Sequence, residues 1–475
     1  MNARYRIFFG ASSLVLGLLF LLAVPGFAAQ GSKVTMLDTI NAALAYNPEL
    51  KAYQEGRQLS GHAVERAKAG HLPNVALYGG AGTSRRDDYN TRGRREDHKF
   101  RAIADVDLRL TQPLFHGFGI VAAVNRAAEE FASSENLLEE QGSSIVYAAI
   151  VAHTDVIRRA ELVRLAKNNE REHAKILGSV SQRYNTGVAT SGELNQVRSR
   201  YSRAKATVAT YSAALDAARA TYLRVTGNEP GDLERAFGPS QAYDNLDMVR
   251  KATLEHSPNL KSALATLRAV VHEKAQAESR FYPFLDLVAG PSWSDRQSKI
   301  DSHVTDLSAE VRLTWDLYSG GGDVAATRMA GAKIRQARQN LHGLMNALNE
   351  EIESTYSRHE AAAVEAKEYN DAKVASRRAR NDYYRQFMAA KRSLIDVLDA
   401  ENDFFYAASQ EVMSLSDRML SAYRLLAISG CILPEVRVDL VTLRVNDPTT
   451  QESSVNNMGE IPSPLSQGWV NIMVK

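Results

Sequence analysis

The sequence lacks most of the residue patterns that mark an enzyme or a disulfide-stabilised protein. Its 475 residues include one cysteine, Cys431, which excludes both an internal disulfide and a multi-cysteine metal site. The HExxH, P-loop and G-x-S-x-G patterns are absent, and the 11 histidines are scattered without metal-ligand spacing. We therefore expect no catalytic activity, no metal and no cofactor.

An excess of one charge and long apolar runs are also missing from the body of the chain. The 57 basic and 55 acidic residues leave a net charge of +2, which gives no sign of a nucleic-acid partner. Mean hydropathy is -0.30, and no stretch after the N-terminus has 18 apolar residues in a row. A membrane-spanning helix is therefore not expected, and entry into a membrane would require a closed barrel.

The N-terminus has the pattern of a secretory signal peptide. Arg4 and Arg6 precede an apolar run from Ile7 to Val24, after which small residues offer a cleavage site. We assign residues 1–29 to this signal peptide, with an uncleaved membrane anchor as the alternative. No cysteine follows the apolar run, so a lipid anchor at the new N-terminus is not expected.

The remaining chain repeats itself. Pro48 and Pro258 are 210 residues apart, as are Pro73 and Pro283. The segment LTQPLFHGFG is matched by LTWDLYSGGG at a spacing of 203 residues. Self-similarity of this kind indicates two copies of one structural unit.

Each copy is expected to contain the same elements in the same order. An alanine-rich helix comes first, then two short strands, a helix of about 65 residues and a returning helix about half as long. In the first copy, residues 30–242, we expect strands at 72–83 and 100–113 and helices at 120–184 and 190–226. In the second copy, residues 243–433, we expect strands at 284–294 and 304–317 and helices at 324–387 and 393–428. The polar tail, residues 434–475, is expected to be partly disordered.

The strands carry the clearest local signal. In the segment TDLSAEVRLTWDL, apolar Leu307, Ala309 and Val311 alternate with polar residues such as Ser308 and Glu310. Alternation over about ten residues is typical of a transmembrane barrel strand, apolar toward lipid and polar toward a wet lumen. A soluble sheet with one buried face is the alternative, and the signal peptide favours the barrel. Four strands per chain cannot close a barrel, so the chain is expected to oligomerise, and three copies would give twelve strands.

These features resemble the TolC-like outer-membrane factors, the exit ducts of type I secretion and multidrug efflux. The resemblance is carried by the duplicated unit, by YNTG and GELNQVRSR in the first copy, and by LYSGGG and SLIDVLDAENDFF in the second. It implies an α+β membrane protein with an internal two-fold repeat. Three chains would form a twelve-stranded transmembrane β-barrel that continues into a long periplasmic α-helical coiled-coil barrel.

The resemblance also implies partners. These are two further copies of the chain, outer-membrane lipid, a periplasmic adaptor and an inner-membrane transporter of the ABC type. A passive duct for type I secretion is favoured because efflux relatives are often lipoproteins and no cysteine lies near the cleavage site. A multidrug or metal efflux component is the alternative, and a secreted structural coiled-coil protein is a remote one.

The resemblance assigns roles to residues near the two helix turns. Asp396 and Asp399 match an aspartate pair that lines the periplasmic entrance. Arg392 and Glu193 match a basic and an acidic residue that hold the entrance closed, and Phe387 stands where the family usually has a tyrosine of this latch. The residues that match the adaptor-docking tips are Thr186, Gly187, Val188, Ala389, Ala390 and Lys391.

Helix capping offers a second interpretation of the acidic residues. Thr190 to Glu193 and Ser393 to Asp396 both read as capping boxes at a helix start. Capping accounts for Asp396 but not for Asp399, which lies one turn further along the same face. In a trimer the two aspartates would form stacked acidic rings, which favour cations. We expect both interpretations to hold.

Overall fold

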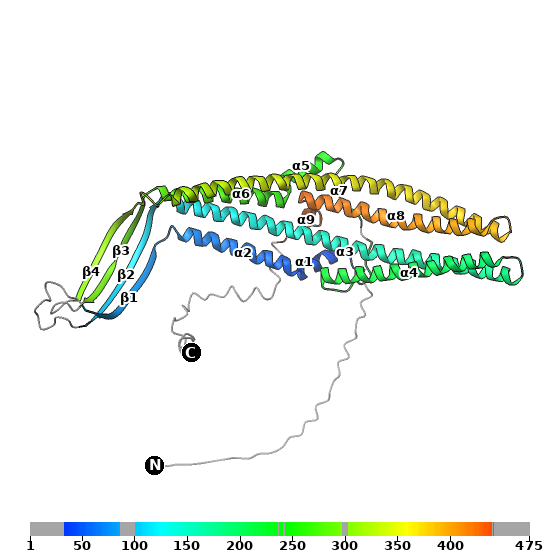
Figure 1. Cartoon of the computed structure of the whole chain (residues 1–475), viewed down its shortest axis with the longest axis horizontal. Coiled ribbons are helices and arrows are strands. Elements are labelled where there is room, and N and C mark those ends of the chain that lie inside the picture. The colour runs from blue at the N-terminus through cyan, green and yellow to red at the C-terminus, as the bar shows by residue number, and fades with distance from the viewer. Residues whose placement is uncertain are drawn as a thin grey trace, which may run out of the picture.

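The structure of the protein, a computed structural model, is an elongated molecule with a small sheet at one end of a long helical body (Figure 1). It describes residues 33–85, 100–235, 237–240, 243–296, 303–438 and 440. The expected signal peptide and the tail beyond residue 440 lie outside the described residues. Among the helices of the described part, none combines the length and apolar character needed to span a bilayer.

Two helical hairpins form most of the body. The first joins α3 (Gly119–Asn185) to α4 (Ser191–Thr226), and the second joins α7 (Gly322–Met388) to α8 (Leu394–Ser429). The two long helices have 67 residues each and the two returning helices 36 each. At 1.5 Å per residue a long helix extends about 100 Å. The shorter helices are α1 (Met36–Tyr46), α2 (Pro48–Ala69), α5 (Leu246–His256), α6 (Pro258–Glu278), the 3-10 turn η1 (Ser279–Phe281) and α9 (Ile432–Glu435).

The short helices continue the returning helices toward the sheet. In Figure 1, α1 and α2 follow α4 along the long axis, and α6 follows α8. Gly227 ends α4 with a φ of 74°, and a Cβ there would lie 2.5 Å from the ring of Tyr46. Gly430 ends α8 with a φ of 77°, and its Cβ would lie 2.7 Å from the carbonyl oxygen of His256. Glycine alone fits both joins, because the φ is positive and the approach is close.

The strands form one antiparallel sheet in the order β1-β2-β3-β4, which confirms the expectation of four strands per chain. Their bounds are β1 (Asn74–Ser84), β2 (Arg101–His116), β3 (Phe284–Arg296) and β4 (His303–Thr314). The two strands from the first half of the chain therefore pair with the two from the second half through β2 and β3. A Cβ at Gly290 would lie 1.8 Å from the carbonyl oxygen of Leu108, so only glycine permits this approach between the central strands.

The two faces of the sheet differ in polarity. Val75, Leu110, Ala289 and Ala309 are register partners across all four strands and form an apolar row. On the other face, the row of Tyr78, Asp107, Ser292 and Asp306 is mostly polar. Large side chains on the apolar face are strongly exposed, including Leu77 at 70 % and Leu307 at 80 %. A wide exposed apolar face on a sheet requires a partner other than water.

The largest hydrophobic cluster lies where α1, α3, α4 and α8 meet, and it includes the fully buried Ile40 and Val146. The buried His153 borders this cluster. Its Nδ1 lies 2.8 Å from Thr39 Oγ1, and its Nε2 lies 2.9 Å from the carbonyl oxygen of Glu234. Because a carbonyl only accepts, Nε2 carries the proton. Burial lowers the pKa of His153, so a neutral ring ties α1 and α3 to the segment after α4.

The two long helices differ in how much of their surface is covered. Along α3, 21 residues are buried, because α2, α4, α6 and α8 all pack against it. Along α7, only 6 residues are buried, although the helix has the same length. Much of α7 is therefore open on the single chain.

Candidate functional site

The hairpin turns lie at the end of the molecule farthest from the sheet (Figure 1). At the first turn, Gly187 has a φ of 79°, and its N–H donates to the carbonyl of Tyr184 over 3.0 Å. The N–H of Val188 donates to the carbonyl of Arg183 over 2.8 Å. These two bonds form a Schellman motif, which ends α3 with a residue in the left-handed region.

The second turn has the same bonds without a glycine. The N–H of Ala390 donates to the carbonyl of Phe387 over 2.9 Å, and the N–H of Lys391 donates to the carbonyl of Gln386 over 2.9 Å. Ala390 has a φ of 58°. The left-handed conformation costs a residue with a Cβ about 1 kcal/mol. The tip that follows α7 is therefore strained where the tip that follows α3 is not.

Both returning helices begin with the capping pairs that the sequence indicates. The carboxylate of Glu193 accepts the N–H of Thr190 over 2.8 Å, and Thr190 Oγ1 accepts the N–H of Glu193 over 3.2 Å. At α8, Ser393 Oγ donates to Asp396 Oδ2 over 2.8 Å. Capping therefore holds Glu193 and Asp396 in the first turns of their helices.

Arg392 and Glu193, which the resemblance pairs as a latch, have different partners within the chain. Arg392 Nε lies 3.1 Å from Asp396 Oδ2, an ion pair without hydrogen-bond geometry. The Arg392 guanidinium also lies 3.8 Å from the centre of the Tyr383 ring. In the described part of the chain, Arg392 and Glu193 form no ion pair with each other, so a latch between them remains a prediction.

Phe387 is buried in the small hydrophobic cluster that joins the two hairpins near their tips. It is 5 % exposed and packs with residues of all four hairpin helices, among them Val180 and Leu398. Arg183 of α3 lies over its ring at 4.6 Å and donates to its carbonyl oxygen over 3.3 Å. Phe387 thus connects the second hairpin to the first by packing and by its backbone carbonyl.

Asp399 forms an ion pair that the sequence does not indicate. Arg200 Nη2 of α4 donates to Asp399 Oδ1 over 3.2 Å. The Asp399 side chain is 57 % exposed and that of Arg200 is 29 % exposed. This pair brings the first hairpin, through α4, onto the aspartate of the second hairpin.

Glu401, two residues after Asp399, is a second group that sequence reasoning missed. It is 3 % exposed, and Arg380 Nη1 lies 3.5 Å from its Oε2. Burial raises the pKa of Glu401 to about 7, an effect that the charge of Arg380 offsets in part and that of Glu172 increases. The hairpin therefore holds a carboxyl group that titrates near neutral pH.

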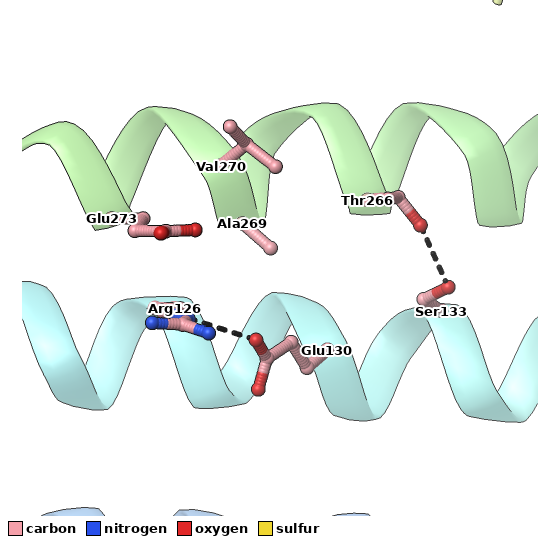
Figure 2. Close-up of a pocket in the computed structure, with 7 residues that line it drawn as sticks. All are labelled: Arg126, Glu130, Ser133, Thr266, Ala269, Val270 and Glu273. Atoms are coloured by element: carbon pink, nitrogen blue, oxygen red, sulfur yellow. Dashed lines mark hydrogen bonds and ion pairs between the residues drawn. The ribbon is translucent and has the colours of Figure 1, made fainter. Parts of the chain in front are cut away.

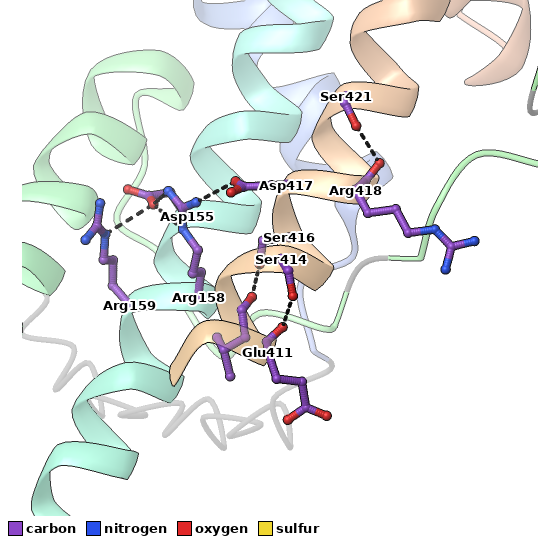
Figure 3. A network of polar contacts seen from close by, with 10 residues as sticks. Asp155, Arg158, Arg159, Glu411, Ser414, Ser416, Asp417, Arg418 and Ser421 are labelled. Carbon is purple, nitrogen blue, oxygen red and sulfur yellow. Dashed lines mark hydrogen bonds and ion pairs between the residues drawn. The ribbon is translucent and has the colours of Figure 1, made fainter. Parts of the chain in front are cut away.

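A polar network near the middle of α3, away from the tips, also joins the two hairpins (Figure 3). Arg158 on α3 pairs with Asp155 on its own helix at 2.5 Å and with Asp417 on α8 at 3.1 Å. Glu411 on α8 pairs with Lys373 on α7. These contacts hold α8 between the two long helices.

A small cavity lies between α3 and α6 and is lined by polar and apolar side chains of both helices (Figure 2). Its volume is about 160 Å³. Arg126 Nε donates to Glu130 Oε1 over 2.8 Å, and Ser133 Oγ lies 3.1 Å from Thr266 Oγ1. Because these lining groups satisfy one another, we assign no ligand to this cavity.

Helical hairpins joined to an antiparallel sheet are also the fold of solved outer-membrane channels such as OprN. The solved structure of the outer membrane protein VceC from Vibrio cholerae matches with a TM-score of 0.72, covering 84% of this chain and 95% of that one at 16% identity. This likeness shows the fold.

The chain belongs to the outer membrane efflux protein family, whose model matches residues 39–228 and 249–431. It is 24% identical to the outer membrane efflux protein BepC of Brucella suis, over 90% of this chain and 92% of that protein. It is 23% identical to the alkaline protease secretion protein AprF of Pseudomonas aeruginosa, over 90% of this chain and 91% of that protein. The resemblance inferred from the sequence is confirmed, and the chain is an outer-membrane protein of a transport family.

Proposed function

We propose that three copies of the chain form a passive exit duct through the outer membrane. The observation that carries this proposal is the sheet, whose apolar face is exposed and whose four strands are too few to close on themselves. Three such sheets would give a twelve-stranded barrel, with the apolar rows toward lipid and the polar rows toward a wet lumen. Closure would also pair the outer edges of β1 and β4 with neighbouring chains.

The helical body supports the same assembly. The hairpins match in length, and their helices begin at a spacing of 203 residues, which supports an internal two-fold repeat. The open surface of α7 needs a neighbour, and a helix of another subunit would cover it in a closed ring of helices. Such a ring would form a tunnel in the periplasm.

The hairpin tips would form the periplasmic entrance of this tunnel. Asp396 and Asp399 would line it, and Arg392, Glu193 and Phe387 would hold it closed. Within the chain Arg392 pairs with Asp396 and Glu193 accepts from Thr190, so a contact between Arg392 and Glu193 would require a rearrangement of the tips or a neighbouring copy of the chain. The exposed tip residues, Val188 at 71 % among them, would dock the adaptor.

We infer further that the duct serves type I secretion, with a periplasmic adaptor and an ABC-type transporter as partners and no enzymatic activity of its own. The similarity to AprF, whose name describes protease secretion, supports this choice. The similarity to BepC, named as an efflux protein, supports a multidrug or metal efflux component as the second candidate.

Crosslinking at the tip tests the choice between these two systems. A cysteine-attached photocrosslinker at Thr186→Cys should capture an adaptor and an ABC transporter in cells. The same probe at Glu65→Cys on α2, near the sheet, is the matched control and should capture neither. Capture of a proton-driven pump instead of an ABC transporter would refute type I secretion. A separate measurement tests the duct itself, because purified wild-type protein that gives no conductance steps in planar bilayers would refute it.

A further inference from the structure

Each aspartate of the expected entrance has an arginine of its own. Asp396 has Arg392 at 3.1 Å on the same hairpin, and Asp399 has Arg200 at 3.2 Å on the other hairpin. The four groups together carry no net charge. A ring built from them is therefore far less acidic than two rings of aspartates alone would be.

Arg200 reaches Asp399 from the third turn of α4. Arg200 also lies near His173 of α3, which is 5 % exposed. Burial and the nearby charge of Arg200 lower the pKa of His173, so its ring is neutral at pH 7 and adds no positive charge. Within the described residues, Arg200 is the only cation in ion-pair contact with Asp399.

The contact between Arg200 and Asp399 crosses from one hairpin to the other over 199 residues of sequence. A hydrogen-bonded ion pair holds only while its atoms remain within about 3 Å. Separation of the hairpins at their tips would break it and would leave Asp399 without its cation. The charge presented by Asp399 is thus linked to the distance between the hairpins.

We propose that Arg200 sets the ion selectivity of the entrance by pairing with Asp399 across the two hairpins. The inference rests on the proposed function, because it requires that Asp399 face the lumen of a trimeric duct. While the hairpins are together, Arg200 offsets the charge of Asp399, and the entrance has little preference for cations over anions. When the hairpins separate, the exposed carboxylate makes the entrance cation-selective.

Reversal potentials in planar bilayers across a KCl gradient test this role. Arg200→Gln should raise the ratio of K⁺ to Cl⁻ permeability about two- to fivefold, the size of a charge interaction at a partly exposed pair. Arg200→Lys keeps the charge and should keep the ratio of the wild type. Arg198→Gln is the matched control, since Arg198 is exposed on the same helix and forms no ion pair in the described part of the chain. It removes the same charge and should leave the ratio unchanged.

Charge exchange provides the second arm. Arg200→Asp should raise the ratio further, and adding Asp399→Arg to it should bring the ratio back toward the wild type. This exchange carries the test if Arg200→Gln does not assemble into trimers on a native gel. An unchanged ratio in Arg200→Gln, equal shifts in Arg200→Gln and Arg198→Gln, or no recovery on exchange would each overturn the role of Arg200. A wild-type protein that forms no conducting channel would overturn the proposed function as well.

Discussion

Replacing Glu401 by glutamine is expected to remove a pH dependence from the stability of the helical body. Glu401 is almost fully buried in α8, and burial raises the pKa of its carboxyl from the ordinary 4.5 to about 7. The folded state therefore binds the proton more tightly than the unfolded chain does. The contribution of Glu401 to the free energy of unfolding is greatest at pH values below 4.5, the pKa of the carboxyl in the unfolded chain. This contribution falls as the pH rises from 4.5 to about 7, and it levels off above that.

The size of this effect follows from the width of that interval. At 1.36 kcal/mol per pH unit, the interval from 4.5 to about 7 corresponds to about 3 kcal/mol. Glutamine has nearly the same shape and cannot ionise, so Glu401→Gln should lose none of this stability on the way to pH 8. Its partner Arg380 keeps contact with water and with the ring of Phe404, which lies 4.4 Å away.

Urea unfolding of the purified protein in detergent, followed by the helical circular dichroism signal from pH 5 to pH 8, measures this difference. The midpoint for the wild type should fall across the range, and the midpoint for Glu401→Gln should stay nearly level. Glu368→Gln, which removes a carboxylate from an exposed position on α7, is the matched control and should follow the wild type. Parallel curves for the wild type and Glu401→Gln would show that Glu401 does not titrate in this range.

Three further predictions concern the sheet and the tips. Ala309→Arg on the apolar face should cost about 2–4 kcal/mol if it lies near the bilayer centre, while Ser308→Arg on the other face should cost little. Heat resistance of the proposed trimer on gels measures both losses, and equal losses would refute the assignment of the faces. Ala390→Gly should stabilise the second tip by about 1 kcal/mol by relieving the positive φ, seen as slower hydrogen exchange there, and faster exchange would contradict the strain. Arg392→Ser loses the Asp396 pair and the Tyr383 contact and should raise conductance in planar bilayers, so an unchanged conductance would count against a latch.

Local sequence patterns were sufficient to predict much of the fold. Alternation of apolar and polar residues indicated the strand in TDLSAEVRLTWDL, because a strand with one apolar and one polar face must repeat every two residues. The capping pairs at Thr190 and Ser393 marked the starts of the returning helices, because their bonds join residues three apart. Both patterns can be recognised in the sequence because the residues that produce them are only two or three positions apart.

The pairs between hairpins could not be read in this way. Arg200 and Asp399 are 199 residues apart, and nothing near either residue selects the other among the many charged side chains of these helices. Glu401 follows Val397 by four residues and so lies on the buried face of α8, a spacing that could have indicated its burial. Charged residues are almost never fully buried without a partner, so composition alone favours the exposed interpretation.

The sheet leaves one strand edge open on each side, at β1 and at β4. Such edges present rows of backbone N–H and C=O groups that can pair with any extended segment. A single chain therefore exposes two unpaired strand edges and an apolar sheet face, all of which the proposed trimer would cover. Until these edges and this face are covered, the chain is expected to be prone to aggregation through edge-to-edge strand pairing.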